Sequence, residues 1–410
     1  MRIGLIGAGR IGAFHTATLA AHPDVGEVLV ADSAPDRAAL VAARHGGRAV
    51  PVEALLPEEG GAGAARPDAV VVATATATHA ELVARAARVG VPVFCEKPVA
   101  LDLPGTLAAV AAAEEAGAVV QVGFQRRFDA EYAAAREAVR GGRLGTLHTV
   151  RTVTSDAEPP PAAYVPLSGG LFRDCLVHDF DILRWVTGLE VAEVYAAGAN
   201  TGAEFFRAAG DVDSGAVLLT LEGGVLATAT AARYHAAGYD VRMELAGSAR
   251  QLAVGLGPRA PLAPPEERPE EQARERPPAV PWTGFLDRFA AAYRAELDTF
   301  LRVARGEAAN PCPPREALRA LLVAEACELS RRERRPVAVA EVAEAAAETG
   351  GTRVSRGSGD TGESGETGRT GAGPGGGPGG GTGSGPGGGT AAGHSGRGGR
   401  AGQATGRVGV

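Results

Sequence analysis

The sequence predicts an α/β domain with a doubly wound parallel sheet, followed by an α+β domain with a mostly antiparallel open sheet. Strands and helices alternate through the first 120 residues, and short strands follow one another from about residue 145. All 19 aromatic residues lie within 1–340, whereas 27 of the 59 glycines lie within 341–410. A segment so poor in apolar side chains cannot offset its ordering entropy. We therefore expect two domains, 1–123 and 124–340, and a disordered Gly-rich tail, 341–410.

The first domain is predicted from runs of β-branched residues that alternate with stretches rich in Ala, Arg and Glu. The expected strands are Arg2–Ile6, Glu27–Asp32, Ala69–Ala73, Pro92–Glu96 and Val119–Gly123. The expected helices are Ile11–Ala21, Pro35–Gly46, His79–Val89 and Leu103–Ala116. Such alternation is typical of βαβ units, in which helices cover both faces of a parallel sheet.

The second domain is predicted from strands that follow one another with short turns. The expected strands are Leu147–Thr154, Val191–Ala199, Gly215–Leu221, Val225–Tyr234 and Tyr239–Leu245. Helices are expected at about 171–187, 283–305 and 314–332. Residues 256–281 are rich in Pro, Glu and Arg and predict a long solvated loop.

Composition and charge argue against several classes of protein. The formal net charge is −7, whereas nucleic acids and anionic membranes both attract a basic surface. The first seven residues predict a strand that runs into a glycine turn rather than a signal peptide, and no apolar run approaches the roughly 18 residues of a membrane helix. The four cysteines form no CxxC pair, so neither a disulfide framework nor a zinc site is expected. We expect a soluble, cytoplasmic protein.

Gly7, Gly9 and Gly12 form the pattern GxGxxG between a predicted strand and a predicted helix. Gly7 would permit a tight turn, Gly9 the approach of a pyrophosphate to the backbone, and Gly12 close packing of helix on strand. The helix N-terminus would supply unpaired N–H groups to the phosphates. We therefore predict a Rossmann-type dinucleotide site in which these glycines, with Arg10 and Ile11, contact the cofactor. The alternative is a glycine turn without a ligand.

Asp32 ends the second predicted strand, about 20 residues after the glycine turn. A carboxylate there accepts hydrogen bonds from the adenosine ribose hydroxyls and repels a 2′-phosphate, so NAD is favoured over NADP. Arg37 lies close enough in sequence to keep use of NADP possible.

Lys97 is the single lysine among 41 basic residues. A position that stays Lys in an Arg-rich chain points to a need for a compact ammonium group, although biased base composition is the alternative. Lys97 follows a predicted strand, so it emerges at the crevice outside the carboxyl ends of the sheet. Pro98 restricts its backbone, and a cis peptide there would fix its aim.

Asp174 and His178 are four residues apart on the predicted helix at 171–187 and share one face, with Asp181 on nearly the same stripe. Ser168-Gly169-Gly170 leads into this helix. The alternative is a surface histidine held by salt bridges along the helix.

Together these motifs resemble the glucose–fructose oxidoreductase, inositol dehydrogenase and rhizopine-catabolism (Gfo/Idh/MocA) family over about residues 1–340. The resemblance rests on the GxGxxG pattern, Glu96-Lys97-Pro98, the VGFQRRFD segment at 122–129, and Ser168-Gly169-Gly170 with Asp174 and His178. The RRFD segment, the Pro-rich loop before Ser168 and Gly238-Tyr239-Asp240 resemble the inositol dehydrogenase branch.

The resemblance implies a catalytic trio of Lys97, Asp174 and His178. His178 would take the proton of the substrate hydroxyl as hydride leaves for the nicotinamide, and an imidazole pKa near 6.5 suits that task. Asp174 would orient the imidazole, and Lys97 would stabilise the developing alkoxide. No metal is needed for this chemistry.

Further contacts are implied by matching positions. Cofactor contacts are expected from Thr74, Thr76, His79, Glu96 and Lys97. Substrate contacts are expected from Arg127, Asp156, Tyr164 and Tyr239, together with the catalytic trio. The family usually has a proline after the first threonine of the fourth-strand loop, whereas Ala75 stands here, so we expect a looser loop.

The function implied is NAD-dependent oxidation of a secondary hydroxyl of a cyclic polyol or sugar, first of all myo-inositol to its 2-keto product. An aldose or other sugar-derivative dehydrogenase is the alternative within the enzyme class. A dinucleotide-binding sensor without catalysis is the alternative outside it, although such a binder needs none of the trio. The resemblance also implies a homodimer or homotetramer.

Overall fold

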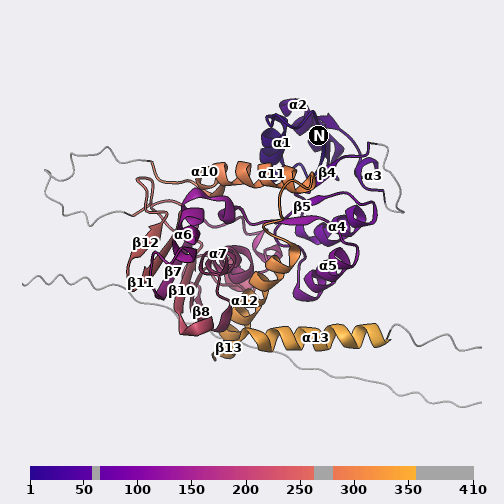
Figure 1. The fold of residues 1–410 in the computed structure, drawn as a ribbon. Helices are drawn as coiled ribbons and strands as arrows, with labels where there is room; N and C mark the ends of the chain where they lie inside the picture. Colours follow the sequence, from indigo (N-terminus) through magenta and orange to yellow (C-terminus); the bar gives the residue numbers. More distant parts are fainter. Residues whose placement is uncertain (58–64, 263–279, 357–410) are drawn as a thin grey trace, which may run out of the picture. The chain divides into compact units, whose positions relative to one another are not determined.

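A computed structural model describes residues 1–57, 65–262 and 280–356, all of which belong to one compact unit. Most of the loop expected at 256–281 and the chain beyond 356 lie outside the described residues. The two sheets predicted from the sequence are both present (Figure 1).

The N-terminal sheet has six parallel strands in the order β3-β2-β1-β4-β5-β6. Their bounds are β1 (Arg2–Ile6), β2 (Glu27–Ala31), β3 (Arg48–Ala49), β4 (Ala69–Val72), β5 (Val93–Glu96) and β6 (Val120–Gly123). The five predicted strands are confirmed to within one residue at each end. Only the two-residue edge strand β3 was missed, because so short a run carries no periodicity. The order reverses between β1 and β4, where a doubly wound sheet opens its binding crevice.

Helices cover both faces of this sheet because successive residues of each strand point to opposite sides. The helices are α1 (Arg10–Ala20), α2 (Pro35–His45), α3 (Val52–Leu55), α4 (His79–Arg88) and α5 (Leu103–Glu115). Val71 packs in the core on one face, while Val70 and Val72 pack in the core on the other. The distant helix α11 (Ala290–Ala304) joins α1 and α2 on the first face through Leu297, Phe300 and Leu301 (Figure 1).

The second sheet has seven strands in the order β12-β11-β7-β10-β9-β8-β13. Their bounds are β7 (Leu147–Ser155), β8 (Val191–Ala199), β9 (Ser214–Leu221), β10 (Leu226–Ala232), β11 (Asp240–Gly247), β12 (Gln251–Val254) and β13 (Val337–Ala338). All neighbouring pairs run antiparallel except β7 and β10, which run parallel. The mostly antiparallel sheet predicted from the sequence is confirmed, with one parallel pair at its centre.

The helices of the second part differ in detail from the predicted ones. They are α6 (Ala130–Arg140), α7 (Val177–Thr187), α8 (Glu204–Ala208), α10 (Phe285–Arg288), α11, α12 (Pro314–Glu333) and α13 (Val339–Arg356). The expected helix at 171–187 is divided into a π-helical turn, η4 (Phe172–Leu176), and α7. The expected helix at 283–305 is divided into α10 and α11, with Phe289 between them. Predicted helix 314–332 matches α12.

Helix α13 corrects the predicted start of the tail at residue 341. The segment from 339 to 348 is rich in Ala and Glu, which favour helix. Its Val339 and Val342 pack against the core of the second sheet, and Val342 and Ala346 pack against α5 and α12. Glycine content therefore placed the boundary too early, because apolar contacts along one helix face stabilise this segment.

Two truncations test where the folded part ends. We expect a chain ending at Arg356 to keep its melting temperature and turnover, because residues 357–410 contain no aromatic residue, leucine or isoleucine. A chain ending at Ala338 should melt several degrees lower, because it loses the apolar contacts of α13. Thermal unfolding of both chains measures the difference. A large drop in the longer chain would contradict the assignment of the tail.

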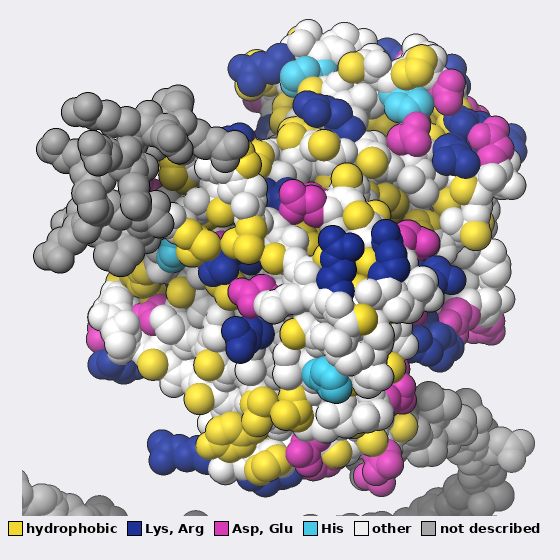
Figure 2. All heavy atoms as spheres, turned by 60° about the vertical axis from the view of Figure 1, so that its left-hand side comes forward, with side chains coloured by type: hydrophobic (Ala, Val, Ile, Leu, Met, Phe, Trp, Pro, Cys, Tyr) yellow, Lys and Arg dark blue, Asp and Glu magenta, His cyan; other side chains and the backbone are white. Residues whose placement is uncertain are grey.

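The surface carries mixed charge. On the face shown in Figure 2, basic and acidic side chains are interspersed, and no broad area of one sign is present on that face. Among the described residues, no helix is long and apolar enough to cross a membrane.

Candidate active site

The glycine turn after β1 has the geometry that a pyrophosphate requires. Gly7 has a φ of +103°, and a Cβ there would lie 2.5 Å from the backbone of Ala73. A Cβ on Gly12 would lie 1.7 Å from the carbonyl oxygen of Gly7, whereas a Cβ on Gly9 would meet nothing within 4 Å. Gly9 is the N-cap of α1, and no side chain caps the first N–H groups of this helix. The residues present thus fit a phosphate group bound over Gly9.

Asp32 lies beside this turn. Its carboxylate accepts hydrogen bonds from the backbone N–H groups of Ala8 (2.7 Å) and Ala34 (2.8 Å). Arg37 pairs with both oxygens, at 3.0 Å from Nε and 2.5 Å from Nη2. Burial opposes ionisation of this carboxyl, but Arg37 and the two N–H groups outweigh it and hold the pKa of Asp32 below its usual range. The Asp32 carboxyl therefore favours its charged form beside the glycine turn.

Four further residues predicted to contact the cofactor lie at the start of α1 and in the loop after β4. Arg10 is exposed at the start of α1, and its guanidinium lies over the Phe285 ring, 5.1 Å from the centroid. Ile11 packs against the core of the second part. In the loop after β4, the hydroxyls of Thr74 and Thr78 are hydrogen bonded at 2.7 Å, and Thr76 begins a short 3-10 turn.

His79 does not present its imidazole to the cofactor site, contrary to the prediction. The side chain is buried, and its two ring nitrogens lie 2.8 Å from the Pro98 carbonyl oxygen and 3.1 Å from that of Thr74. Its position at the first turn of α4 places the imidazole between two loops. His79 therefore connects the loop after β4 to the segment that carries Lys97.

Glu96 makes a buried contact within the protein, and its predicted contact with the cofactor stays a prediction. Its carboxylate is buried and lies 2.6 Å from Nε2 of His15, a residue of α1 whose side chain is fully buried. His15 has no signal in the sequence, because a lone histidine on an apolar helix forms no pattern. The pair links α1, which begins at the glycine turn, to the residue before Lys97.

Lys97 brings the two parts of the structure together. The Lys97–Pro98 peptide bond is cis. The ammonium Nζ donates to the carbonyl oxygen of Asp174 at 3.1 Å and lies 3.4 Å from Asp174 Oδ1. Since Lys97 follows β5 and Asp174 lies in η4, this contact joins the nucleotide-binding sheet to the second part.

Asp174 is the centre of a polar cluster. Its Oδ1 accepts from the Tyr164 hydroxyl at 3.0 Å, and its Oδ2 accepts from Arg233 at 2.8 Å. Burial opposes its ionisation, but Lys97 and Arg233 outweigh burial and lower the pKa of the Asp174 carboxyl. A π-helical turn such as η4 is frequent at functional sites.

Asp156 joins the same cluster through Arg233. Arg233 was not predicted from the sequence. Arg233 Nη1 donates to Asp156 Oδ2 at 3.0 Å, and the Cys175 thiol lies 3.8 Å from the same oxygen. Burial raises the pKa of Asp156 despite this arginine. Tyr239 is buried, and burial raises the pKa of its phenol. An arginine that ends a strand of small residues is the only signal that could have pointed to Arg233.

His178 lies on α7, one turn after Asp174. Among the described residues its Nδ1 has no hydrogen-bond partner, and its ring meets Phe124 edge to face at 5.7 Å. Burial, followed by the charges of Lys97 and Arg126, lowers the pKa of His178 well below 6.5. Among the described residues no hydrogen bond runs from this imidazole to the Asp174 carboxylate, whose oxygens accept from Tyr164, Lys97 and Arg233.

Arg127 is not brought to this cluster, and its predicted contact with substrate is a further correction. The side chain is buried and pairs with Asp181 through Nε at 2.9 Å and Nη2 at 2.5 Å. Its Nη1 donates to the Pro311 carbonyl oxygen at 2.8 Å, and Nη2 also lies 3.1 Å from Glu316. With each guanidinium nitrogen engaged, Arg127 connects η2 (Gln125–Phe128), α7 and α12.

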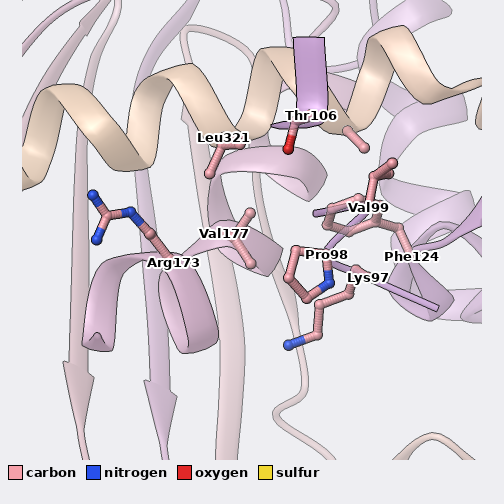
Figure 3. A pocket seen from close by; sticks show the side chains of 9 residues that line it. Lys97, Pro98, Val99, Thr106, Phe124, Arg173, Val177 and Leu321 are labelled. Carbon is pink, nitrogen blue, oxygen red and sulfur yellow. The ribbon is translucent and has the colours of Figure 1, made fainter. Parts of the chain in front are cut away.

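A small pocket lies behind Lys97 rather than beside the polar cluster. Its lining is mostly apolar and comes from the segments after β5 and β6, from η4 and α7, and from α5 and α12. It includes Pro98, Val99, Phe124, Val177 and Leu321. In Figure 3 the Lys97 side chain extends past Pro98 with its ammonium directed away from Val99 and Thr106. Since Asp174 and His178 do not line it, we assign this pocket to the support of Lys97 and not to the substrate.

Two family models match this chain, one in each of its two parts. Residues 1–124 match the model of the oxidoreductase family with an NAD-binding Rossmann fold. Residues 132–253 match the model of the GFO/IDH/MocA C-terminal domain. The two matches cover the parallel sheet and most of the second sheet, which are the parts that contribute Lys97 and the Asp174 cluster.

Individual relatives cover the same region. An inositol 2-dehydrogenase of Rhizobium meliloti (strain 1021) is 35% identical over 339 residues, which are 83% of this chain and 99% of the relative. The crystal structure of a myo-inositol dehydrogenase from Corynebacterium glutamicum is 34% identical with a TM-score of 0.72, covering 82% of this chain and 98% of that one. A scyllo-inositol dehydrogenase from Lactobacillus casei, crystallised with NAD(H) and scyllo-inositol, is 27% identical with a TM-score of 0.70, covering 83% and 99%.

Proposed function

The chain belongs to the Gfo/Idh/MocA family of NAD-dependent oxidoreductases that act on CH–OH groups, and we propose that its substrate is a cyclic polyol, first of all myo-inositol, oxidised to the 2-keto product. The observation that carries the proposal is the contact of Lys97 with Asp174, beside His178. A lysine at the carboxyl edge of the nucleotide-binding sheet thereby meets a largely buried acid and a neutral histidine of the second part. Relatives named as inositol dehydrogenases support the choice of substrate.

NAD supplies the hydride acceptor, nicotinamide C4, when it is bound. His178 serves as the general base that takes the proton from the substrate hydroxyl. Its lowered pKa keeps the imidazole neutral at pH 7, and a neutral ring nitrogen is the form that accepts a proton. Nδ1 is buried and has no partner among the described residues, so no hydrogen bond there holds the imidazole in one tautomer.

Lys97 holds the reacting hydroxyl and stabilises negative charge as it develops on the oxygen. Its bond to the Asp174 carbonyl oxygen and its longer contact with Oδ1 hold the ammonium in the site while leaving it further donors. Asp174 thus positions Lys97 rather than His178. Asp156, Tyr164 and Tyr239 are proposed to bind the other hydroxyls of the ring.

A sensor without catalysis is the rival from another class. Such a protein needs the glycine turn and Asp32, but it needs neither a neutral histidine nor a lysine paired with a largely buried acid. An aldose or other sugar-derivative dehydrogenase remains the alternative enzyme, because the same trio can act on any secondary hydroxyl held in the same place.

A substrate panel tests the proposal. Purified protein is mixed with NAD and with myo-inositol, scyllo-inositol, aldoses or acyclic polyols, and NADH formation is followed by absorbance. We expect the highest kcat/KM with an inositol. Faster turnover of an aldose would favour the alternative enzyme, and NADH binding without turnover of any polyol or aldose would favour the sensor.

Cofactor preference is tested at Asp32. We expect the wild-type enzyme to prefer NAD, and Asp32→Ala to narrow the NAD/NADP ratio of kcat/KM by at least about tenfold. The charged carboxylate repels a 2′-phosphate, and its removal frees Arg37 to pair with that phosphate. A repulsion of about 1.4 kcal/mol suffices for a tenfold change. Steady-state kinetics with both cofactors measures the ratio, and a wild-type preference for NADP would contradict the assignment.

We further propose how the chain is organised in the cell. Residues 1–123 would bind the nucleotide and the second sheet the polyol, since the parallel sheet ends at Gly123. Assembly as a homodimer or homotetramer is supported by apolar side chains exposed on β8, β9 and β10: Tyr195, Leu218 and Leu226. The four buried, unpaired cysteines are compatible with the reducing cytoplasm. Sedimentation equilibrium would measure the oligomer.

A further inference from the structure

Arg233 occupies an unusual position for an arginine. It directly follows β10, whose last residue Ala232 pairs with Ser155 of the parallel neighbour β7. Asp156, the residue after β7, donates its backbone N–H to the Ala232 carbonyl oxygen at 2.9 Å. The Arg233 side chain is only 3% exposed, and its backbone N–H donates to the Asp213 carbonyl oxygen at 2.8 Å. Backbone pairing at the centre of the sheet therefore determines where this guanidinium lies.

The guanidinium bridges two acids that come from different elements. One nitrogen donates to Asp156 at the end of β7, at 3.0 Å, and another donates to Asp174 in η4, at 2.8 Å. Through Asp174 the same chain of contacts continues to Lys97. A single buried cation thus separates two carboxylates that would otherwise face each other in a largely buried site.

The electrostatic consequence follows from the groups around the two acids. Burial and the Asp174 charge raise the pKa of Asp156, whereas Arg233 lowers it. Burial raises the pKa of Asp174, and Lys97 and Arg233 outweigh that effect. The other titratable groups next to the pair are Tyr164 and Cys175, together with Tyr239 beside Asp156. Without Arg233, Lys97 is the only described cation that pairs directly with either acid.

We propose that Arg233 is a positioning residue for the reaction: it holds Asp156 and Asp174 ionised and aimed at the polyol, and it leaves the Lys97 ammonium for the reacting hydroxyl. The proposal rests on the proposed function. Lys97 makes only a 3.4 Å contact with the Asp174 carboxylate because Arg233 neutralises that carboxylate from the other side at 2.8 Å. Removal of Arg233 would draw the ammonium fully onto Asp174 and away from substrate.

The kinetic test uses Arg233→Met and Arg233→Lys. We expect kcat/KM of the Met variant at pH 7 to fall about a hundredfold, as for a misplaced reacting group. The acid limb of its pH profile should move upward by about one pH unit or more, because a carboxyl that loses an arginine partner gains a proton at higher pH. Lysine restores one charge but reaches a single carboxylate. The acid limb of the Arg233→Lys profile should therefore move in the same direction by less.

Arg184→Met is the matched control. Arg184 is also 3% exposed and also bridges two acids, Glu190 and Glu316, away from the polar cluster. Its loss should cost comparable thermal stability and leave the acid limb in place. If the acid limb of the pH profile stays in place in the Arg233 variants and activity falls only as in the control, Arg233 is merely structural. If Arg233→Met does not fold, an unmoved limb in Arg233→Lys overturns the proposal.

A measurement independent of turnover separates this proposal from the proposed function. The carboxyl ¹³C shifts of labelled aspartates are followed against pH in wild type and Arg233→Lys, with Asp156→Asn and Asp174→Asn used for assignment. We expect both carboxyls to protonate at higher pH in the lysine variant. Unchanged titration would overturn the role of Arg233, whereas a shifted titration in a protein that oxidises no polyol would contradict the proposed function alone.

Discussion

Replacement of Lys97 with arginine should lower kcat by about two decades or more, while NAD affinity changes only a few-fold. The substitution keeps the positive charge but exchanges a compact ammonium for a wider planar group. In the structure the ammonium fits between the Asp174 carbonyl oxygen and carboxylate, with Pro98 and Phe124 lining the apolar pocket behind it. A guanidinium there displaces either substrate or nicotinamide, and a misplacement on the order of 1 Å can cost about a hundredfold.

The measurement for Lys97 separates chemistry from cofactor binding. Steady-state kinetics supplies kcat, and a fluorescence titration with NADH supplies the affinity. Lys97→Met is the companion variant, because it removes the charge without added bulk and should be at least as impaired. If Lys97 only attracted a cofactor phosphate, arginine would serve nearly as well. Near-normal turnover of Lys97→Arg would remove Lys97 from the mechanism and favour the sensor.

Replacement of His178 with asparagine should lower kcat by about 10²- to 10⁴-fold, the usual contribution of a general base. Asparagine keeps a polar group of similar reach but cannot take the proton of the hydroxyl. NADH affinity should stay within a few-fold, because His178 belongs to α7 of the second part.

The pH profile adds an independent readout for His178. Because burial and the neighbouring cations lower its pKa, the neutral, proton-accepting form persists as the pH falls past 6.5. Any loss of wild-type kcat/KM that comes from protonation of this imidazole should therefore occur below pH 6.5, and not between pH 8 and 6.5. His148→Asn, on an exposed position of β7, is the control and should retain full activity. Normal turnover in His178→Asn would assign the base to another group.

Much of the nucleotide-binding sheet could be predicted because its determinants are local in the sequence. Every strand of this sheet except the two-residue β3 is a short, mostly apolar run. The glycine turn, Asp32 and the Lys97-Pro98 pair each follow the end of such a strand. Parallel strands present their carboxyl ends at one edge, so these residues were expected to meet there. Asp174 and His178 were found in the same way, because residues four apart share a helix face.

The partners of each side chain were harder to predict, because they depend on contacts between distant segments. His79, Glu96 and Arg127 match family positions, yet His79 contacts two loop carbonyls and Arg127 pairs with Asp181. Glu96 pairs with His15, 81 residues earlier. Helix α13 was assigned to the tail for the same reason, since its contacts with the second sheet, α5 and α12 are not visible in composition.

The sequence by itself determined the succession of strands and helices along the chain and the glycine turn after β1, because periodicity and short motifs encode them. The catalytic trio of Lys97, Asp174 and His178 is a prediction that the family resemblance implied. Only the tertiary structure showed that the Asp174 carboxylate contacts Lys97 and not His178 among the described residues, and that Arg233 bridges Asp174 to Asp156. The physical reason is that a buried charge is stable only beside a partner, and the pairing of β7 with β10 supplies that partner from 59 residues further along the chain.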